Sequence, residues 1–183
     1  VRAQLGSPAA LAVLSDVAGR AADERFDEAS WRGVRQHALA VLLDNGQFDL
    51  ARPLFAAVAA EPEAWADALF ALHVVDDAPA AEALGAVLRN PGKLEVRKDG
   101  VPVSLKDVAA LALSLMRAEV TAPVLDPLLA ASPPGVEGDP APFAAMTLGY
   151  RGEPDDLARG AERARELVRT GDDRLPPAKI LER

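Results

Sequence analysis

The feature that most constrains the fold of this chain is an internal repeat. Residues 50–62 read LARPLFAAVAAEP, and residues 79–91 repeat the same order of apolar positions as PAAEALGAVLRNP. Both copies end at a proline, which cannot continue a helix. Self-similarity at a period of roughly 20 to 50 residues is typical of helical hairpins that stack side by side. The repeat therefore predicts an all-α fold of stacked antiparallel helical hairpins, an architecture that mainly binds other macromolecules.

The composition favours the same fold. Half of the 183 residues are hydrophobic and only 4% are aromatic, so Ala, Leu and Val carry the apolar content. Ala and Leu are strong helix formers, and small side chains let helix axes approach closely. A chain of this length buries about 70% of its surface on folding, so it needs no metal or disulfide to fold, and cysteine is absent.

Apolar periodicity, caps and prolines divide the chain into consecutive helices. We expect helices over about 8–21, 27–45, 49–60, 63–75, 79–89, 105–119, 122–130, 143–150 and 155–171. The stretch 63–75 is unusual because only Asp67 and His73 interrupt its apolar residues. A helix that is apolar on all sides is buried on all sides, so we place this one at the centre of the fold.

A short β-hairpin is expected at 93–103, between two helices. Polar and apolar residues alternate through 93–97, Asp99 and Gly100 supply a tight turn, and valines occupy alternate positions after it. Ser104 then caps the next helix, with Asp107 at the capping-box position three residues on.

The domain organisation follows from these elements. We expect one α-helical domain over 1–183, with a helical stack carrying the hairpin insertion at 1–131. A Pro- and Gly-rich loop at 132–142 precedes a C-terminal helical pair at 143–171, and a loose tail occupies 172–183.

Charge and hydropathy exclude several classes of partner. The chain has 28 acidic and 20 basic side chains, which gives a net charge of -8. Because contacts with phosphate groups need clustered cations, nucleic acid is not expected as a partner. Its apolar runs fall far short of the roughly 20 residues that span a bilayer, and no secretory signal pattern precedes them. We therefore expect a soluble, cytoplasmic protein without a membrane partner. A homo-oligomer is compatible with the sequence, because open helical stacks expose apolar ends.

Residues 31–91 resemble the tetratricopeptide repeat. In the first unit, from Trp31 to Pro62, the residues that fit the motif of the family are Gly46, Phe48, Ala51, Phe55 and Pro62. Trp31 and Trp65 lie 34 residues apart, which is the usual repeat length of that family. The second unit, about 64–91, is shorter and lacks the turn glycine, and the hairpin at 93–103 is foreign to the family. The resemblance implies paired helices and a habit of binding peptides, and it assigns no functional residue.

The motifs of common catalytic sites are absent from the sequence. There is no Gly-rich phosphate loop, no Gly-x-Ser-x-Gly elbow, no His-Glu-x-x-His helix and no calcium loop. We therefore expect a non-enzymatic protein with no cofactor and no metal.

Six residues are candidates for contact with a partner, namely Trp31, Arg35, Trp65, His73, Arg97 and Lys98. The tryptophans are potential binding anchors, but each starts a helix at a core-facing position, which favours a packing role. His73 is either a ligand or base in a pocket, or a core histidine bonded to a backbone carbonyl or to Asp76. Arg97 and Lys98 belong to a small basic patch on the hairpin, where interleaved acids also suit a solvated, charged edge.

Three functions remain open at this point. The repeat pattern favours a scaffold or adaptor module that captures a peptide or helix of a partner protein, in the groove formed by the first helix of each pair. The negative charge suits an acidic inhibitor or immunity-type protein that covers a basic site on its partner. A small-molecule-binding regulator or enzyme would use a pocket around His73, Trp65 and Tyr150.

Overall fold

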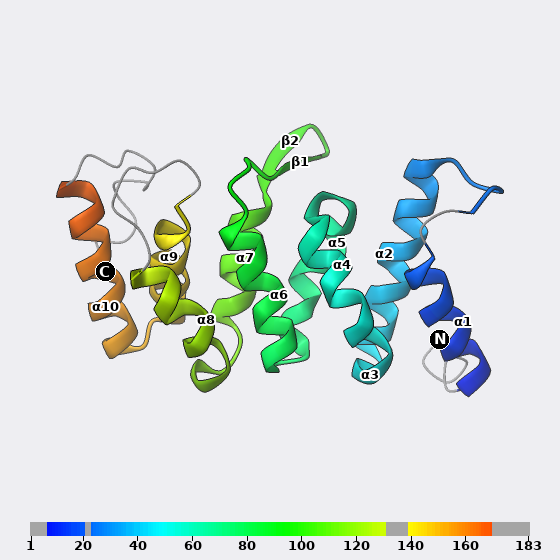
Figure 1. Ribbon diagram of the computed structural model, residues 1–183, viewed down its shortest axis with the longest axis horizontal. Coiled ribbons are helices and arrows are strands. Elements are labelled where there is room, and N and C mark those ends of the chain that lie inside the picture. Colours follow the sequence, from blue (N-terminus) through cyan, green and yellow to red (C-terminus); the bar gives the residue numbers. More distant parts are fainter. Residues whose placement is uncertain (1–6, 21–22, 131–138, 170–183) are drawn as a thin grey trace.

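The computed structural model describes residues 7–20, 23–130 and 139–169. In this part of the chain the helices follow one another in sequence order along the long axis of the molecule (Figure 1). Two strands form an antiparallel hairpin that projects from one edge of the row. The predicted all-α fold with packed helix pairs and one small β-hairpin is confirmed. The predicted tail at 172–183 and most of the loop at 132–142 lie outside the described residues.

The N-terminal helices are α1 (Pro8–Gly19), α2 (Glu28–Asp44), α3 (Phe48–Ala51), η1 (Arg52–Leu54) and α4 (Phe55–Ala60). The central elements are η2 (Pro62–Trp65), α5 (Ala66–Leu69), η3 (Phe70–Val74), α6 (Ala78–Arg89), β1 (Glu95–Lys98) and β2 (Val101–Ser104). The C-terminal helices are α7 (Leu105–Ser114), α8 (Ala118–Ala130), α9 (Ala141–Arg151) and α10 (Pro154–Arg169).

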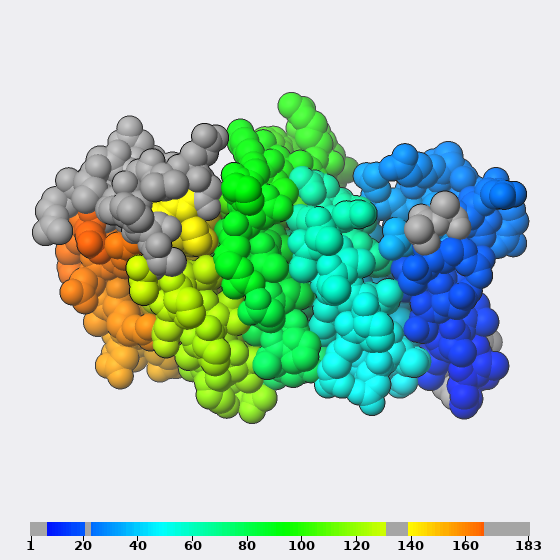
Figure 2. All heavy atoms as spheres, viewed as in Figure 1, coloured from blue at the N-terminus to red at the C-terminus, as the bar shows by residue number. Residues whose placement is uncertain are grey.

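The helices form two layers. In the first layer α2 packs against α5 and η3, η3 packs against α7, and α7 packs against α9. In the second layer α4 packs against α6, and α6 packs against α8. Successive pairs form bands across the surface, in the order of the sequence (Figure 2). A continuous cluster of buried apolar side chains connects the bands, from Ala18 in α1 to Leu148 in α9.

The segment 63–75 corrects one prediction. It is built of the short elements η2, α5 and η3 rather than one helix, and it is not buried on all sides, because Phe70 and Val74 are exposed. Neighbouring helices cover its sides, but within the described residues no helix packs on the face of the first layer that is turned away from the second. The apolar residues on that face remain on the surface.

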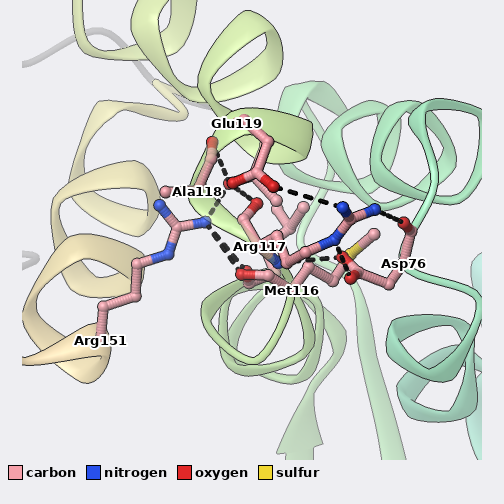
Figure 3. A network of polar contacts seen from close by, with 8 residues as sticks. Asp76, Met116, Arg117, Ala118, Glu119 and Arg151 are labelled. Carbon is pink, nitrogen blue, oxygen red and sulfur yellow. Dashed lines mark hydrogen bonds and ion pairs between the residues drawn. The ribbon is translucent and has the colours of Figure 1, made fainter.

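The predicted helix 105–119 is wrong at its C-terminal end. Ser104 caps α7 as expected by accepting a hydrogen bond from the backbone of Asp107, but α7 ends at Ser114 and α8 begins at Ala118. Asp76, which precedes α6, accepts hydrogen bonds from the backbone N–H of Arg117 at 2.9 Å and from its Nε at 2.5 Å (Figure 3). This contact fixes a turn between α7 and α8, and the helix expected at 122–130 therefore begins earlier.

A second arginine holds the same turn from the other side. Arg151 of α9 reaches the α7–α8 turn, as Figure 3 shows, and its Nη2 donates to the carbonyl oxygens of Leu113 at 3.3 Å and Met116 at 3.5 Å. The same nitrogen contacts the hydroxyl of Thr121, and Nη1 lies 3.4 Å from Asp156 of α10. The side chain of Arg151 is only 6% exposed, so this guanidinium joins α7, α8, α9 and α10 from within the stack.

Candidate functional site

A hollow lies on the open face of the first layer, beneath the β-hairpin. We call it the hairpin groove. It has a volume of about 910 Å³ and is bounded by α5, η3, the hairpin and α7, with Arg32 of α2 at one end. Its main apolar lining residues are Ala66, Phe70, Val96, Val103, Val108 and Leu111. The structure therefore places a groove where the first helices of adjacent pairs meet.

An exposed apolar stripe runs through the groove and beyond it. Phe70 and Val74 are four residues apart on η3, and Leu111 and Leu115 are four residues apart at α7 and its C-terminal end. These four side chains are between 38 and 56% exposed, and η3 packs directly against α7. Large contiguous apolar surfaces on a soluble fold commonly mark interaction sites.

The hairpin forms one wall of the groove. Asp99 and Gly100 both have positive φ, at 52° and 81°, which is the conformation of a tight hairpin turn. Val96 pairs with Val103, so both side chains lie on the face of the hairpin that lines the groove. Val101 shares this face by strand alternation and is exposed near the tip.

Two contacts hold this wall in place. At its base, the N–H of Leu105 donates to the carbonyl oxygen of Leu94 at 2.9 Å. Near its tip, Nζ of Lys98 lies 3.2 Å from Oδ1 of Asp67 on α5. The ion pair joins two exposed side chains and is therefore weak, so the base of the hairpin is fixed more firmly than its tip.

A second hollow lies beside the first, between the α1–α2 connection, the start of α2 and the α4–η2 turn. We call it the aromatic hollow; its volume is about 530 Å³. Phe26 stacks on Trp31 with ring centroids 5.6 Å apart, and the Phe26 ring is exposed. Arg32 lines both hollows, so the two are neighbours along the first layer, and we refer to them together as the depression.

Two hydrogen-bonded carboxylates, those of Asp23 and Asp27, hold the chain at the edge of the aromatic hollow. Hydrogen bonds from the side chain and backbone of Arg25 hold the pKa of Asp23 well below its usual range. The pKa of Asp27 is also lowered, because its carboxylate accepts hydrogen bonds from the hydroxyl and N–H of Ser30 at the start of α2. These bonds fix the approach of the chain to α2 and with it the position of Phe26.

The two candidate tryptophans pack within the fold. Trp65 is 1% exposed, and the guanidinium of Arg35 lies over its ring at 4.6 Å. Trp31 is also buried, and its indole N–H donates to the carbonyl oxygen of Arg20 at 3.0 Å. Arg35 lines the aromatic hollow and donates through Nε to the carbonyl oxygen of Ala18 at 3.1 Å. The structure therefore brings Trp31, Arg35 and Trp65 together beneath the aromatic hollow.

His73 lies at a partly exposed position rather than in the core. Its Nδ1 is 2.7 Å from the carbonyl oxygen of Phe70, and its ring packs on the Phe70 ring with centroids 4.6 Å apart. Trp65, His73 and Tyr150 occupy the separate elements η2, η3 and α9, and Tyr150 is exposed. These three side chains line neither of the two hollows.

Sequence reasoning found part of the groove and missed the rest. Arg97 and Lys98, two of the six candidates, line it. Arg32, Phe70 and Leu111 also line it and are not among those candidates. Phe70 and Leu111 belong to apolar patterns at helical spacing, and such patterns by themselves indicate packing in a core.

Comparisons of the chain with protein-family models, with curated proteins and with solved structures find no match. Among the described residues, no group of three or more His, Asp or Glu side chains is arranged to hold a metal ion. None of the described helices is both long enough and apolar enough to cross a membrane.

Proposed function

We propose that this chain is a non-enzymatic protein-interaction module of tetratricopeptide-like architecture, which binds a peptide or helix of a partner protein in the hairpin groove. The observation that carries the proposal is the exposed apolar stripe of Phe70, Val74, Leu111 and Leu115, which continues from a groove with a β-hairpin as its wall. A helix laid in an apolar groove buries its own apolar face by the same contacts.

The proposal is supported energetically by the apolar side chains that remain exposed at the groove. Burying an aromatic or leucine side chain contributes about 1.5–3 kcal/mol, so four partly exposed side chains offer a partner a substantial gain. The side chains of Val96 and Val103 line the groove, so side-chain packing is the mode of binding that this wall supports.

The proposal is tested by quantitative capture from a lysate of the organism that carries the gene. Three immobilised proteins are compared: the wild type, the groove variant Phe70→Ser/Leu111→Ser, and the control Val13→Ser/Tyr150→Ser, which removes exposed side chains outside the groove. We expect a protein captured in stoichiometric amount by the wild type and the control, and depleted at least about tenfold by the groove variant. A tenfold loss of affinity corresponds to about 1.4 kcal/mol of binding free energy.

Thermal unfolding of all three proteins separates lost binding from lost folding. If the groove variant melts early, Val101→Glu at the exposed hairpin tip replaces it, because that side chain lies outside the core. Identical capture by the wild type and the folded groove variants would remove the proposal.

A further inference from the structure

We infer that the segment bound in the hairpin groove is amphipathic and basic at one end, with Lys or Arg side chains reaching the aromatic hollow while its apolar side chains fill the groove. The inference rests on the proposed function and adds the chemistry and direction of the partner. Its evidence is the distribution of unpaired charge along the depression.

The two hollows are arranged to hold one continuous segment. Arg32 lines both, and the α4–η2 turn lies between them, with Glu61 at the aromatic hollow and Glu63 at the hairpin groove. A segment that leaves the groove past Arg32 therefore passes both carboxylates.

Carboxylates without cation partners gather toward the aromatic hollow. Within the described part of the chain, no ion pair engages the exposed side chains of Glu24, Glu61 or Glu63. Arg32 bonds to Glu28 at 2.8 Å, and Arg35 lines the hollow with one positive charge, so the three carboxylates outnumber the one arginine there that has no ion pair within the described residues. This end of the depression therefore favours cations.

The opposite end has one uncompensated positive charge among the described residues, that of Arg97, because Glu95 pairs with Lys93 at 3.1 Å. Arg97 and Lys98 project from the hairpin, and Arg97 donates only to the carbonyl oxygen of Gly100, at 3.3 Å, in the described contacts. Lys98 is paired with Asp67. A ligand that is basic toward α2 and neutral or acidic toward the hairpin tip matches this gradient, and complementary charge of this kind sets the orientation of a bound segment.

The aromatic hollow also suits the side chain of arginine. The guanidinium carbon of Arg25 already lies 5.9 Å from the centroid of the Phe26 ring, so this ring accepts a cation from within the chain. Phe26 remains exposed and its ring is held by Trp31. Trp31 stacks on this ring and Arg25 lies over it, so a partner arginine in the hollow either displaces Arg25 from Phe26 or pairs directly with the carboxylates of Glu24 and Glu61.

The test is a display selection from a library of random 16-residue peptides against three targets. The first target is the wild type, and the second is the acid variant Glu24→Gln/Glu61→Gln/Glu63→Gln. The third is a charge-matched control, Asp44→Asn/Glu153→Gln/Glu162→Gln, which changes exposed carboxylates that have no ion pair within the described residues. From the wild type and the control we expect peptides with apolar residues at helical spacing and Lys or Arg clustered at one end. Against the acid variant, their affinity should fall about tenfold, in keeping with the loss of several exposed charge contacts.

The outcomes separate this inference from the proposed function. In one outcome, the selected peptides bind the acid variant as tightly as the wild type but lose affinity for Phe70→Ser/Leu111→Ser. That result would overturn the inference that the bound segment has a basic end, and it would leave the groove proposal intact. If Phe70→Ser/Leu111→Ser and Val101→Glu bind the selected peptides as the wild type does, both proposals fail. Affinity that falls on raising the salt concentration from 50 to 500 mM supports the inference, because exposed charge contacts are screened.

Discussion

Two neighbouring junctions of the stack use their side chains in opposite ways. Where α7 meets α8 and α9, Arg151 and Arg117 direct their guanidinium groups to carbonyl oxygens and carboxylates of the chain itself (Figure 3). Where α7 meets η3, one helix pair earlier, Phe70 and Leu111 remain exposed, and a hollow opens between the helices and the hairpin.

The difference separates the structural part of the stack from the part available for binding. At the first junction the guanidinium group of Arg151, whose side chain is 6% exposed, donates hydrogen bonds to groups of the neighbouring helices, and such contacts favour one fixed packing. At the second junction the helices pack along their buried sides only, and the apolar surface that is left has no partner within the described residues. Substitutions at the two junctions should therefore affect different properties, stability at one and binding at the other.

The largest effect on stability is expected for Arg151→Ala. The substitution removes a buried cation and leaves the carbonyl oxygens of Leu113 and Met116 without that donor, so the free energy of unfolding should fall by about 3 kcal/mol. Urea denaturation followed by circular dichroism measures it. Arg165→Ala on α10 is the control, because this exposed side chain has no ion pair in the described part of the chain, and its effect should stay below about 0.5 kcal/mol. Equal effects of the two substitutions would contradict the distinction between the junctions.

A smaller loss is expected where α6 and α8 touch. A Cβ added at Gly85 would lie 2.3 Å from Cγ1 of Val124, so Gly85→Ala should destabilise the fold by about 1 kcal/mol through overpacking. Gly33→Ala on α2 is a matched helical substitution with no atom within 4 Å of the new Cβ, and it should stabilise the fold by about 0.5–1 kcal/mol. Thermal unfolding of both variants measures the opposite signs. A stabilising effect of Gly85→Ala would show that α8 yields at this contact.

The smallest effect concerns the edge of the aromatic hollow and depends on pH. The pKa of Asp23 lies below its ordinary value of 3.8, so the folded state favours the carboxylate, and its stabilising contribution is complete above that value. As the pH falls from 3.8 toward the lower pKa of the folded state, the contribution is lost. Asp23→Asn should therefore lower the melting temperature at pH 6, and its difference from the wild type should shrink below about pH 4.

The control for this prediction is Asp44→Asn, at an exposed carboxylate without an ion pair in the described ranges. Its melting temperature should follow the wild type throughout the titration. If the difference between Asp23→Asn and the wild type is constant from pH 6 to pH 2.5, the Arg25 contact has no part in holding the α1–α2 connection.

Local signals in the sequence predicted the elements whose causes are local. Asp99 and Gly100 between alternating residues predicted the hairpin, Ser104 predicted the start of α7, and Gly46, with φ of 69°, ends α2 in the left-handed conformation as expected. The break between α7 and α8 could not be predicted in this way. It depends on Asp76, which is 41 residues from Arg117 in the sequence.

The candidate site was predictable only in part for a related reason. Helical spacing shows that Phe70, Val74 and Leu111 share helix faces with apolar neighbours, but it does not show whether a third layer covers those faces. The fold has two layers, so these residues line a surface instead of a core. Arg32 has no distinguishing pattern around it, and its position at both hollows follows only from how α2 packs beside α5.

The hydrogen bond between Leu105 and Leu94 has a consequence for how this surface can diversify. Because this bond joins the two ends of the hairpin, the chain leaves and re-enters the helical stack at the same place. The length of the inserted segment 95–103 therefore does not alter the spacing of the helices on either side. Longer, shorter or differently charged versions can be exchanged at this position while the scaffold is kept. Under the proposed function, changes in this segment alter the wall of the groove and with it the preference for a partner, while the helices beneath keep their packing.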